Sequence, residues 1–214
     1  MKHPCTPPRG FTLVEMLVGA ALSVVLVLGI FSALDSGGRF VERGVRIAEV
    51  ESHARRLLER MTRELESSGV GTFVPGGSLV TGSSDLTFQR NQGYVAGAIV
   101  WGAQARIASV LDPAETDNGL DDDGDGLVDE GRLTYWPDVA GGPVAWANGV
   151  AEFLEGEVGG NGLDDNGNGL TDEPGLCFTL VGRVLTLRIT IERAGVGGVR
   201  ARDSSETSLL VRNP

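Results

Sequence analysis

The hydrophobic residues of this chain begin with one long stretch. Residues 11–34 contain a single charged side chain, that of Glu15, in a segment that is otherwise apolar or small. As an α-helix the stretch is about 36 Å long, enough to cross the roughly 30 Å hydrocarbon core of a bilayer. The basic residues Lys2 and Arg9 precede it, and positive charge ahead of a span favours a cytoplasmic N-terminus. The pattern therefore predicts a transmembrane helix, with everything after Leu34 exported.

A second apolar pattern, with the spacing of an amphipathic helix, follows the first. Its hydrophobic residues recur at every third or fourth position and are Val50, Ala54, Leu57, Met61 and Leu65. The pattern stops at Ser67-Ser68-Gly69, where small and polar residues favour helix termination. We therefore expect one long helix from Phe11 to about Ser67, with Gly37 as a place for a kink. Its 35–67 part is expected to continue the membrane segment and to pack on the remaining chain.

From Val70 onward the pattern changes to short alternating segments and glycine-containing turns. Alternation predicts strands at 85–90, 133–136, 178–181, 184–191 and 208–211. Gly182-Arg183 predicts a tight hairpin between the third and fourth of these strands. The predicted fold class is α+β, a long N-terminal α-helix packed on an antiparallel β-sheet head. This head, 68–214, carries two Asp/Gly-rich insertions at 117–130 and 160–173.

Composition narrows the possible functions. The formal net charge is −11, and no Lys/Arg-rich run occurs in the second half of the chain, so a nucleic-acid partner is not predicted. No histidine follows Val70, which excludes Ser-His and Cys-His nucleophile systems and His-bound zinc from the head. We therefore do not expect an enzyme. The two cysteines are Cys5 and Cys177.

The order of charge, small residue and apolar stretch at the N-terminus is unlike that of a secretory signal peptide. Such a peptide has its small-residue cleavage site after the apolar stretch, whereas here Gly10 precedes it. The residues GFTLVEMLV, 10–18, resemble the prepilin signal of type IV pilins and type II secretion pseudopilins. The resemblance implies a leader of residues 1–10, removed by a prepilin peptidase between Gly10 and Phe11, and methylation of the new α-amino group of Phe11. Removal of the leader would leave Cys177 without a disulfide partner in its own chain.

Glu15 is the one carboxylate within the predicted membrane helix. A charged side chain there costs about 3 kcal/mol on insertion scales, so it normally has a partner. The family resemblance implies that Glu15 attracts the α-amine of a neighbouring subunit, so that the chain assembles with other pilins or pseudopilins through its N-terminal helix. The alternative is that Glu15 snorkels to the interface or bonds the N-terminus of its own chain.

The remaining likeness to this family is more general. The helical segment RLLERMTREL, 56–65, and the closing Val211-Arg212-Asn213 resemble minor pilins, more narrowly the PilW or GspJ type. This implies a structural component of a type IV pilus or type II secretion filament, acting in initiation or at the tip. The protein would span the bacterial inner membrane before assembly and then join a pilus or periplasmic pseudopilus. The alternative function is a calcium-dependent adhesin or cargo-binding head displayed on the filament tip.

Two acidic segments form an internal repeat. Residues 117–130 read DNGLDDDGDGLVDE and residues 160–173 read GNGLDDNGNGLTDE, with ten of the fourteen positions identical. Alternating carboxylates on a glycine-rich turn can converge on one hard cation, as in the EF-hand loop. The first set of candidate ligands is Asp121, Asp123, Asp125, the carbonyl of Leu127, and Asp129 or Glu130. The second set is Asp164, Asn166, Asn168, the carbonyl of Leu170, and Asp172 or Glu173.

Both segments depart from the EF-hand at its twelfth position. The bidentate Glu expected there is replaced by Arg132 in the first segment and Gly175 in the second. The segments resemble instead the shorter calcium loops of dockerins and thrombospondin type 3 repeats, which implies up to two structural Ca²⁺ ions. Two Asn replacements predict weaker binding by the second segment. The alternative is a pair of solvated Asp/Gly turns without metal.

Overall fold

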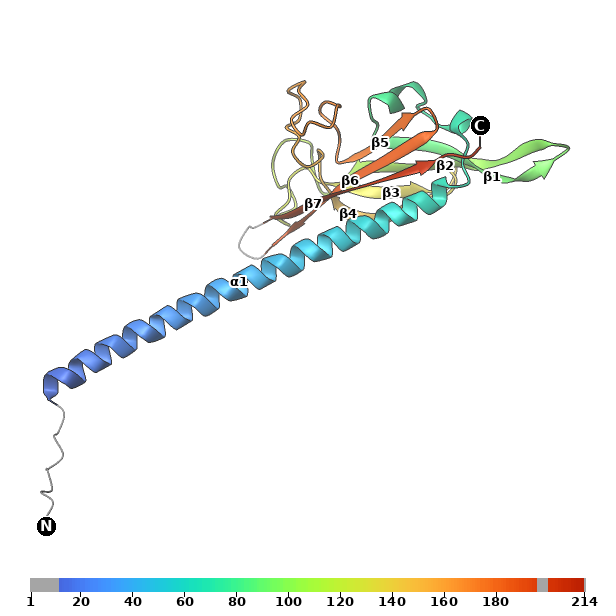
Figure 1. The fold of residues 1–214 in the computed structure, drawn as a ribbon. Helices are drawn as coiled ribbons and strands as arrows, with labels where there is room; N and C mark the ends of the chain where they lie inside the picture. Colours follow the sequence, from blue (N-terminus) through green and yellow to red (C-terminus); the bar gives the residue numbers. More distant parts are fainter. Residues whose placement is uncertain (1–11, 196–199, 214) are drawn as a thin grey trace, which may run out of the picture. The chain divides into compact units, whose positions relative to one another are not determined.

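The computed structural model describes residues 12–195 and 200–213 (Figure 1). The chain divides after Val45 into two compact units, the second of which is Arg46–Pro214. One helix, α1 (Leu13–Leu65), is followed by seven antiparallel strands in one sheet. The predicted α+β fold class is therefore confirmed. The helix passes through Gly37-Gly38 without leaving helical conformation.

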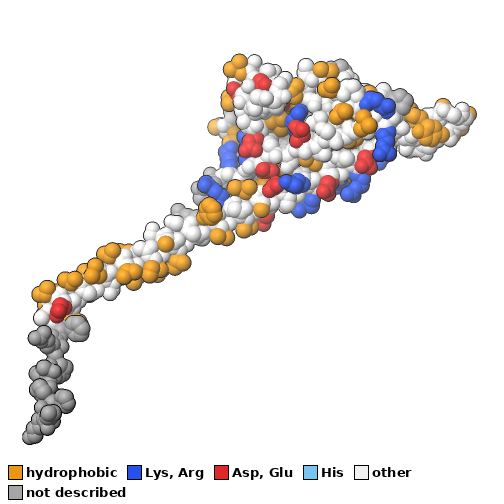
Figure 2. Space-filling model, in the orientation of Figure 1, with side chains coloured by type: hydrophobic (Ala, Val, Ile, Leu, Met, Phe, Trp, Pro, Cys, Tyr) orange, Lys and Arg blue, Asp and Glu red, His pale blue; other side chains and the backbone are white. Residues whose placement is uncertain are grey.

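The N-terminal part of α1 exposes its apolar side chains all round. Leu13, Leu22 and Phe31 are each more than half exposed, and hydrophobic side chains follow one another along this stretch in Figure 2. In the described part of the chain, α1 is the helix that is long and apolar enough to cross a membrane, with a window of mean hydropathy 2.6. An apolar N-terminal helix of this kind fits a membrane-anchored protein.

The second unit is built on the sheet. The strands are β1 (Asp85–Val95), β2 (Ala98–Leu111), β3 (Gly131–Trp136), β4 (Val144–Val150), β5 (Leu176–Val181), β6 (Val184–Ala194) and β7 (Arg200–Leu210). Their order is β1-β2-β3-β4-β6-β5, and β7 pairs with the other edge of β6. Two short 3₁₀ helices, η1 (Val70–Thr72) and η2 (Gly77–Val80), connect α1 to β1.

The two ends of this strand order are joined. The N–H and C=O groups of Ser83, just before β1, bond those of Phe178 in β5, at N···O distances of 3.1 and 2.8 Å. The sheet must therefore curl until β5 approaches the start of β1. Gly82 lies at this closure with φ +94°, and a Cβ there would stand 2.8 Å from the sulfur of Cys177.

The C-terminal part of α1 supplies one side of the core. The predicted stripe is confirmed, because Val50, Ala54, Leu57, Met61 and Leu65 are all buried, and they cluster with buried strand residues such as Phe88, Leu133 and Leu187. Polar contacts fix the same face. The Glu64 carboxylate accepts hydrogen bonds from Arg90 of β1 at 3.1 Å and from the Tyr135 hydroxyl of β3 at 2.9 Å.

The strand predictions identified five of the seven strands. The structure confirms strands at the five predicted places and the Gly182-Arg183 hairpin, where Val181 pairs with Val184. The sequence pattern missed β2 and β4, which are rich in Ala and Gly and so have weak alternation. It also placed the start of β7 too late. That strand begins at Arg200, with polar residues whose side chains are mostly partly or fully exposed.

The topology brings both acidic segments to one end of the sheet. The first connects β2 to β3, where Leu111 pairs with Gly131. The second connects β4 to β5, and Val150 at the end of β4 pairs with both Gly131 and Ile191. Because neighbouring strands are antiparallel, the β1–β2 and β3–β4 hairpins lie at the opposite end.

We predict that Met61→Ala lowers the free energy of unfolding by about 2–5 kcal/mol, because it leaves a cavity between α1 and the sheet. Met61 is fully buried, whereas Glu59 on the other face of the same turn is exposed. Urea denaturation of the full chain in detergent micelles measures the change, with Glu59→Ala as the control. Equal effects of the two substitutions would show that packing of Met61 against the sheet does not stabilise the fold.

Candidate functional site

The first turn of α1 is closed by a reciprocal pair of hydrogen bonds. The Thr12 hydroxyl oxygen accepts from the Glu15 N–H at 3.2 Å, and Glu15 Oε2 accepts from the Thr12 N–H at 2.8 Å. This is the capping-box arrangement. In a single subunit Glu15 therefore bonds the start of its own helix. The predicted cleavage residues Gly10 and Phe11 lie outside the described residues, and a contact of Glu15 with a neighbouring subunit stays a prediction.

The first acidic loop is held by its own carboxylates. Asp121 accepts the N–H of Gly124 at 2.7 Å and that of Gly126 at 2.9 Å. Asp123 and Asp125 each accept the N–H two residues further on, at 2.9 and 2.8 Å. The Asx turns at Asp123 and Asp125 wind the backbone tightly. The tight winding requires positive φ angles, which Gly124 and Gly126 adopt at +78° and +94°. Asp123 and Asp125 use only Oδ1 for these bonds.

Two groups of acidic side chains converge in this loop. Carboxylate oxygens of Asp121, Asp123 and Asp125 lie within 4.8 Å of one another, as do those of Glu115, Asp123 and Glu130. Two oxygens bound to one Ca²⁺ at 2.3–2.6 Å are at most about 5 Å apart. The spacing therefore suits a shared divalent cation, and Asp123 belongs to both groups.

Glu130 is the buried member of these groups. Its side chain is 3% exposed, and its Oε2 has no hydrogen-bond partner among the described residues. Burial, together with the negative charges of Asp125, Glu115 and Asp123, raises the pKa of Glu130 to about 7. A buried, unpartnered carboxylate is unfavourable when ionised. A cation at this place would remove that cost.

Asp129, the alternative to Glu130 in the predicted set, has a different task. Its carboxylate accepts the N–H of Asn118 at 3.0 Å and that of Gly119 at 2.6 Å. It lies outside both acidic groups, and its backbone has φ +49°. Asp129 therefore closes the loop backbone, while Glu130 is the residue that points to the other carboxylates.

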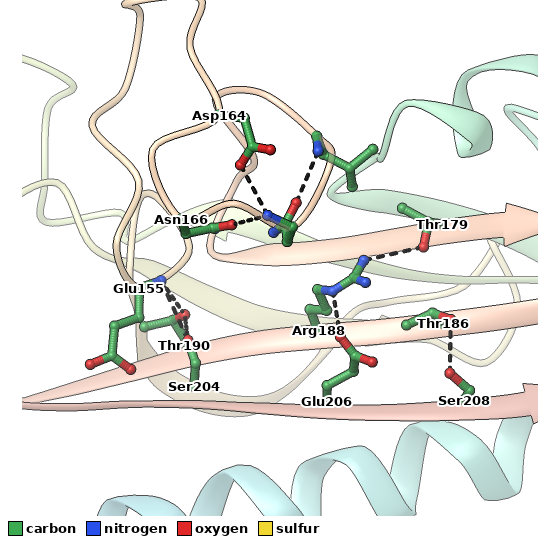
Figure 3. A network of polar contacts seen from close by, with 12 residues as sticks. Glu155, Asp164, Asn166, Thr179, Thr186, Arg188, Thr190, Ser204, Glu206 and Ser208 are labelled. Atoms are coloured by element: carbon green, nitrogen blue, oxygen red, sulfur yellow. Dashed lines mark hydrogen bonds and ion pairs between the residues drawn. The ribbon is translucent and has the colours of Figure 1, made fainter.

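The second loop has the same internal frame. Asp164 accepts the N–H groups of Gly167, Asn168 and Gly169 at 2.7, 3.0 and 2.8 Å. Asn166 also accepts from Asn168, at 3.0 Å, so that the side chains of Asp164 and Asn166 point to one backbone N–H (Figure 3). Asn168 in turn accepts from Leu170 at 2.9 Å.

The last two residues of the second loop repeat the division seen in the first. Asp172, with φ +50°, accepts from Asn161 at 3.1 Å and from Gly162 at 2.9 Å. Glu173 is 1% exposed, and neither of its carboxylate oxygens has a hydrogen-bond partner in the described part of the chain. Each loop thus ends in an Asp that binds backbone N–H groups, followed by a buried Glu with at least one carboxylate oxygen that has no partner among the residues described.

The residues at the twelfth position of the EF-hand pattern, Arg132 and Gly175, have structural roles at the bases of the loops. The Arg132 guanidinium donates to both oxygens of Asp112, at 2.6 and 2.9 Å, and joins the two ends of the first loop at its base. Gly175 approaches the sheet so closely that a Cβ would lie 1.8 Å from the carbonyl oxygen of Ala151. Neither position can therefore supply the bidentate Glu of an EF-hand.

Two buried glutamates of these loops were not predicted from the sequence. Glu115 accepts the N–H groups of Asp122 and Asp123 at 3.2 and 3.1 Å. Glu157 accepts those of Asn166 and Asp172 at 3.0 and 3.2 Å. Both precede the repeated segment, and Glu157 stands one residue further from it than Glu115 does. An alignment of the two segments without a gap therefore does not pair Glu115 with Glu157. The sequence does show an acidic residue shortly before each segment, and this signal could have identified them.

Comparison with known proteins gave two matches. Residues 7–31 match the family described as the prokaryotic N-terminal methylation motif, which supports a type IV pilin-like protein. An uncharacterized protein of Aquifex aeolicus (strain VF5) is 33% identical over 86 residues, which are 40% of this chain and 29% of that protein. The chain thus covers less than a third of this relative's length. No solved structure matches.

We predict that Asp129→Ala lowers the free energy of unfolding by about 1–3 kcal/mol, because two N–H groups lose their acceptor. Alanine is also disfavoured at positive φ. Asp129→Asn is expected to cost less, since Asn tolerates this conformation and keeps an acceptor oxygen. Urea denaturation in the presence of chelator measures both variants without metal. If Ala and Asn cost the same, the carboxylate does not hold the turn.

Proposed function

We propose that this protein is a minor pilin or pseudopilin of the PilW or GspJ type, a structural subunit of a type IV pilus or type II secretion filament. The methylation motif at residues 7–31 carries the proposal. The exposed apolar surface of α1 from Leu13 to Leu34 supports it, because such a surface needs a membrane or other apolar helices around it. The role is structural, in initiation or at the filament tip.

Processing would convert the membrane-anchored precursor into a subunit that can assemble. A prepilin peptidase would cut between Gly10 and Phe11 and methylate Phe11, whose α-amine keeps its positive charge. In the described hydrogen bonds Glu15 uses one oxygen, Oε2, so the other can accept from the α-amine of a neighbouring subunit. The head would be exported while the helix stays in the inner membrane until assembly.

We further propose that the acidic loops bind Ca²⁺ and that the ions stabilise the head. The support is the convergence of Asp121, Asp123 and Asp125 within 4.8 Å in the first loop. Carboxylate oxygens are the ligands that Ca²⁺ prefers. The second loop replaces two of these carboxylates by Asn166 and Asn168, which keeps the oxygen ligands and lowers the charge.

We predict that the protein purified from membranes begins at Phe11 and is one methyl group heavier than the unmodified chain, as measured by mass spectrometry. Glu15→Gln should be processed normally but enter filaments poorly, because it cannot pair its charge with a neighbouring α-amine. Asp35→Asn, a carboxylate change beyond the apolar stretch, is the control. A first residue downstream of Leu34, or a retained Met1, would contradict the pilin assignment.

We predict that Ca²⁺ raises the thermal midpoint of the full mature chain in detergent, because a ligand that binds only the folded state stabilises it. The comparison is between excess Ca²⁺, excess Mg²⁺ and chelator, with Mg²⁺ less effective because it requires a stricter geometry. Asp121→Asn with Asp123→Asn should remove most of the Ca²⁺ effect. An unchanged midpoint, with no calcium in the purified protein, would defeat the metal proposal.

A further inference from the structure

The two loops are longer structural repeats than their sequences indicate. In the first, the Asp112 N–H donates to the Glu130 carbonyl at 3.0 Å, and the Glu115 N–H donates to the Asp112 carbonyl at 2.9 Å. In the second, the corresponding donors bond at 3.0 and 3.1 Å, from Leu154 to Glu173 and from Glu157 to Leu154. Both loops therefore share one backbone frame that begins before the repeated segment.

In the first loop this frame places the glutamate from the loop's entry close to the glutamate at its end, and the second loop has glutamates at the equivalent positions. In the first loop, oxygens of Glu115 and Glu130 lie within 4.8 Å of each other and of an Asp123 oxygen. Glu115 is 7% exposed and Glu130 is 3% exposed. In the second loop the equivalent positions are Glu157, 7% exposed, and Glu173, 1% exposed.

The glutamates at the ends of the loops are not fully satisfied by the protein. Glu130 Oε2 and both oxygens of Glu173 are buried without a hydrogen-bond partner among the described residues. The bonds that Glu115 accepts from Asp122 and Asp123 leave lone pairs free, since a carboxylate offers about four acceptor sites. Like charges this close together are destabilising unless a cation lies between them. A hard cation with oxygen ligands meets that need.

We propose that Glu115 and Glu130, with Asp123, are calcium ligands in the first loop, and that Glu157 and Glu173, with Asn166, are their counterparts in the second. Each ion is thus closed by two glutamates, one that precedes the repeated segment and one that ends it. This inference deepens the proposed calcium binding and rests on it. The proposed ligand set extends beyond the repeated segment, because Glu115 and Glu157 precede it in the sequence.

The two sites differ in charge. In the first loop the group of Glu115, Asp123 and Glu130 shares Asp123 with the group of Asp121, Asp123 and Asp125. The second retains Glu157, Asp164 and Glu173, with Asn166 and Asn168 at the other two positions. Since affinity for Ca²⁺ rises with the number of charged ligands, the first site should fill at lower Ca²⁺ than the second.

The experiment measures Ca²⁺ stoichiometry and affinity by calorimetric titration of the full mature chain in detergent. We expect two bound ions in the parent protein. Glu115→Gln should weaken the tighter site at least tenfold, and Glu157→Gln should do the same to the weaker site. The matched controls are Asp117→Asn and Glu155→Gln, which remove exposed carboxylates that belong to neither proposed ligand set and should change neither site.

A second measurement separates a ligand from a residue that only supports the fold. In chelator, Glu173→Gln should leave the thermal midpoint unchanged or raise it, because it removes an unpartnered buried charge. With Ca²⁺ the same variant should gain less stability than the parent. If Glu173→Gln lowers the midpoint in chelator, or if the Glu115 and Glu157 variants bind two ions as the parent does, the inference is overturned. Calcium lost only on substitution of Asp121 or Asp123 would overturn it while leaving the proposed function intact.

Discussion

The second unit depends on one buried interface, between the apolar face of α1 and the inner face of the sheet. Ala54, Met61 and Leu65 are fully buried there, and Glu64 ties the same face to two strands through Arg90 and Tyr135. Further toward the N-terminus the same helix is apolar all round and exposed. A helix of this second kind needs lipid or other helices around it. The change of pattern within α1 therefore divides the chain into an anchor and a head.

The helix and the fold class could be predicted from the sequence because each depends on local periodicity. The stripe from Val50 to Leu65 follows from spacing alone, as does the strand Val184–Ala194, whose burial alternates over its first half. The strands β2 and β4 could not be predicted so well. Ala98–Leu111 is held by two neighbours, β1 and β3, so pairing compensates for its weak alternation.

The same contrast holds for the acidic loops. The repeat is visible in the sequence, and the Asx turns at Asp123 and Asp125 follow from residue type and glycine position. Which acid faces the others was not visible. Asp129 and Glu130 are adjacent and carry the same charge, so the sequence does not tell which of them faces the other carboxylates. The backbone of Asp129 has a positive φ, and with this turn it is Glu130 that lies with Glu115 and Asp123. Glu115 and Glu157 depend on the backbone bonds that close each loop across its base, which no local pattern records.

The proposed ions fit a head whose one described cysteine, Cys177, forms no disulfide. Cys177 is fully buried in β5, and burial raises the pKa of its thiol to about 11, which disfavours the reactive thiolate. Both loops leave the same end of the sheet, where they form the long connections from β2 to β3 and from β4 to β5. A cation that binds residues from both sides of a loop restricts that loop much as a covalent link would, but only where calcium is available. The proposed calcium sites therefore tie the order of one end of the sheet to the calcium concentration around the head.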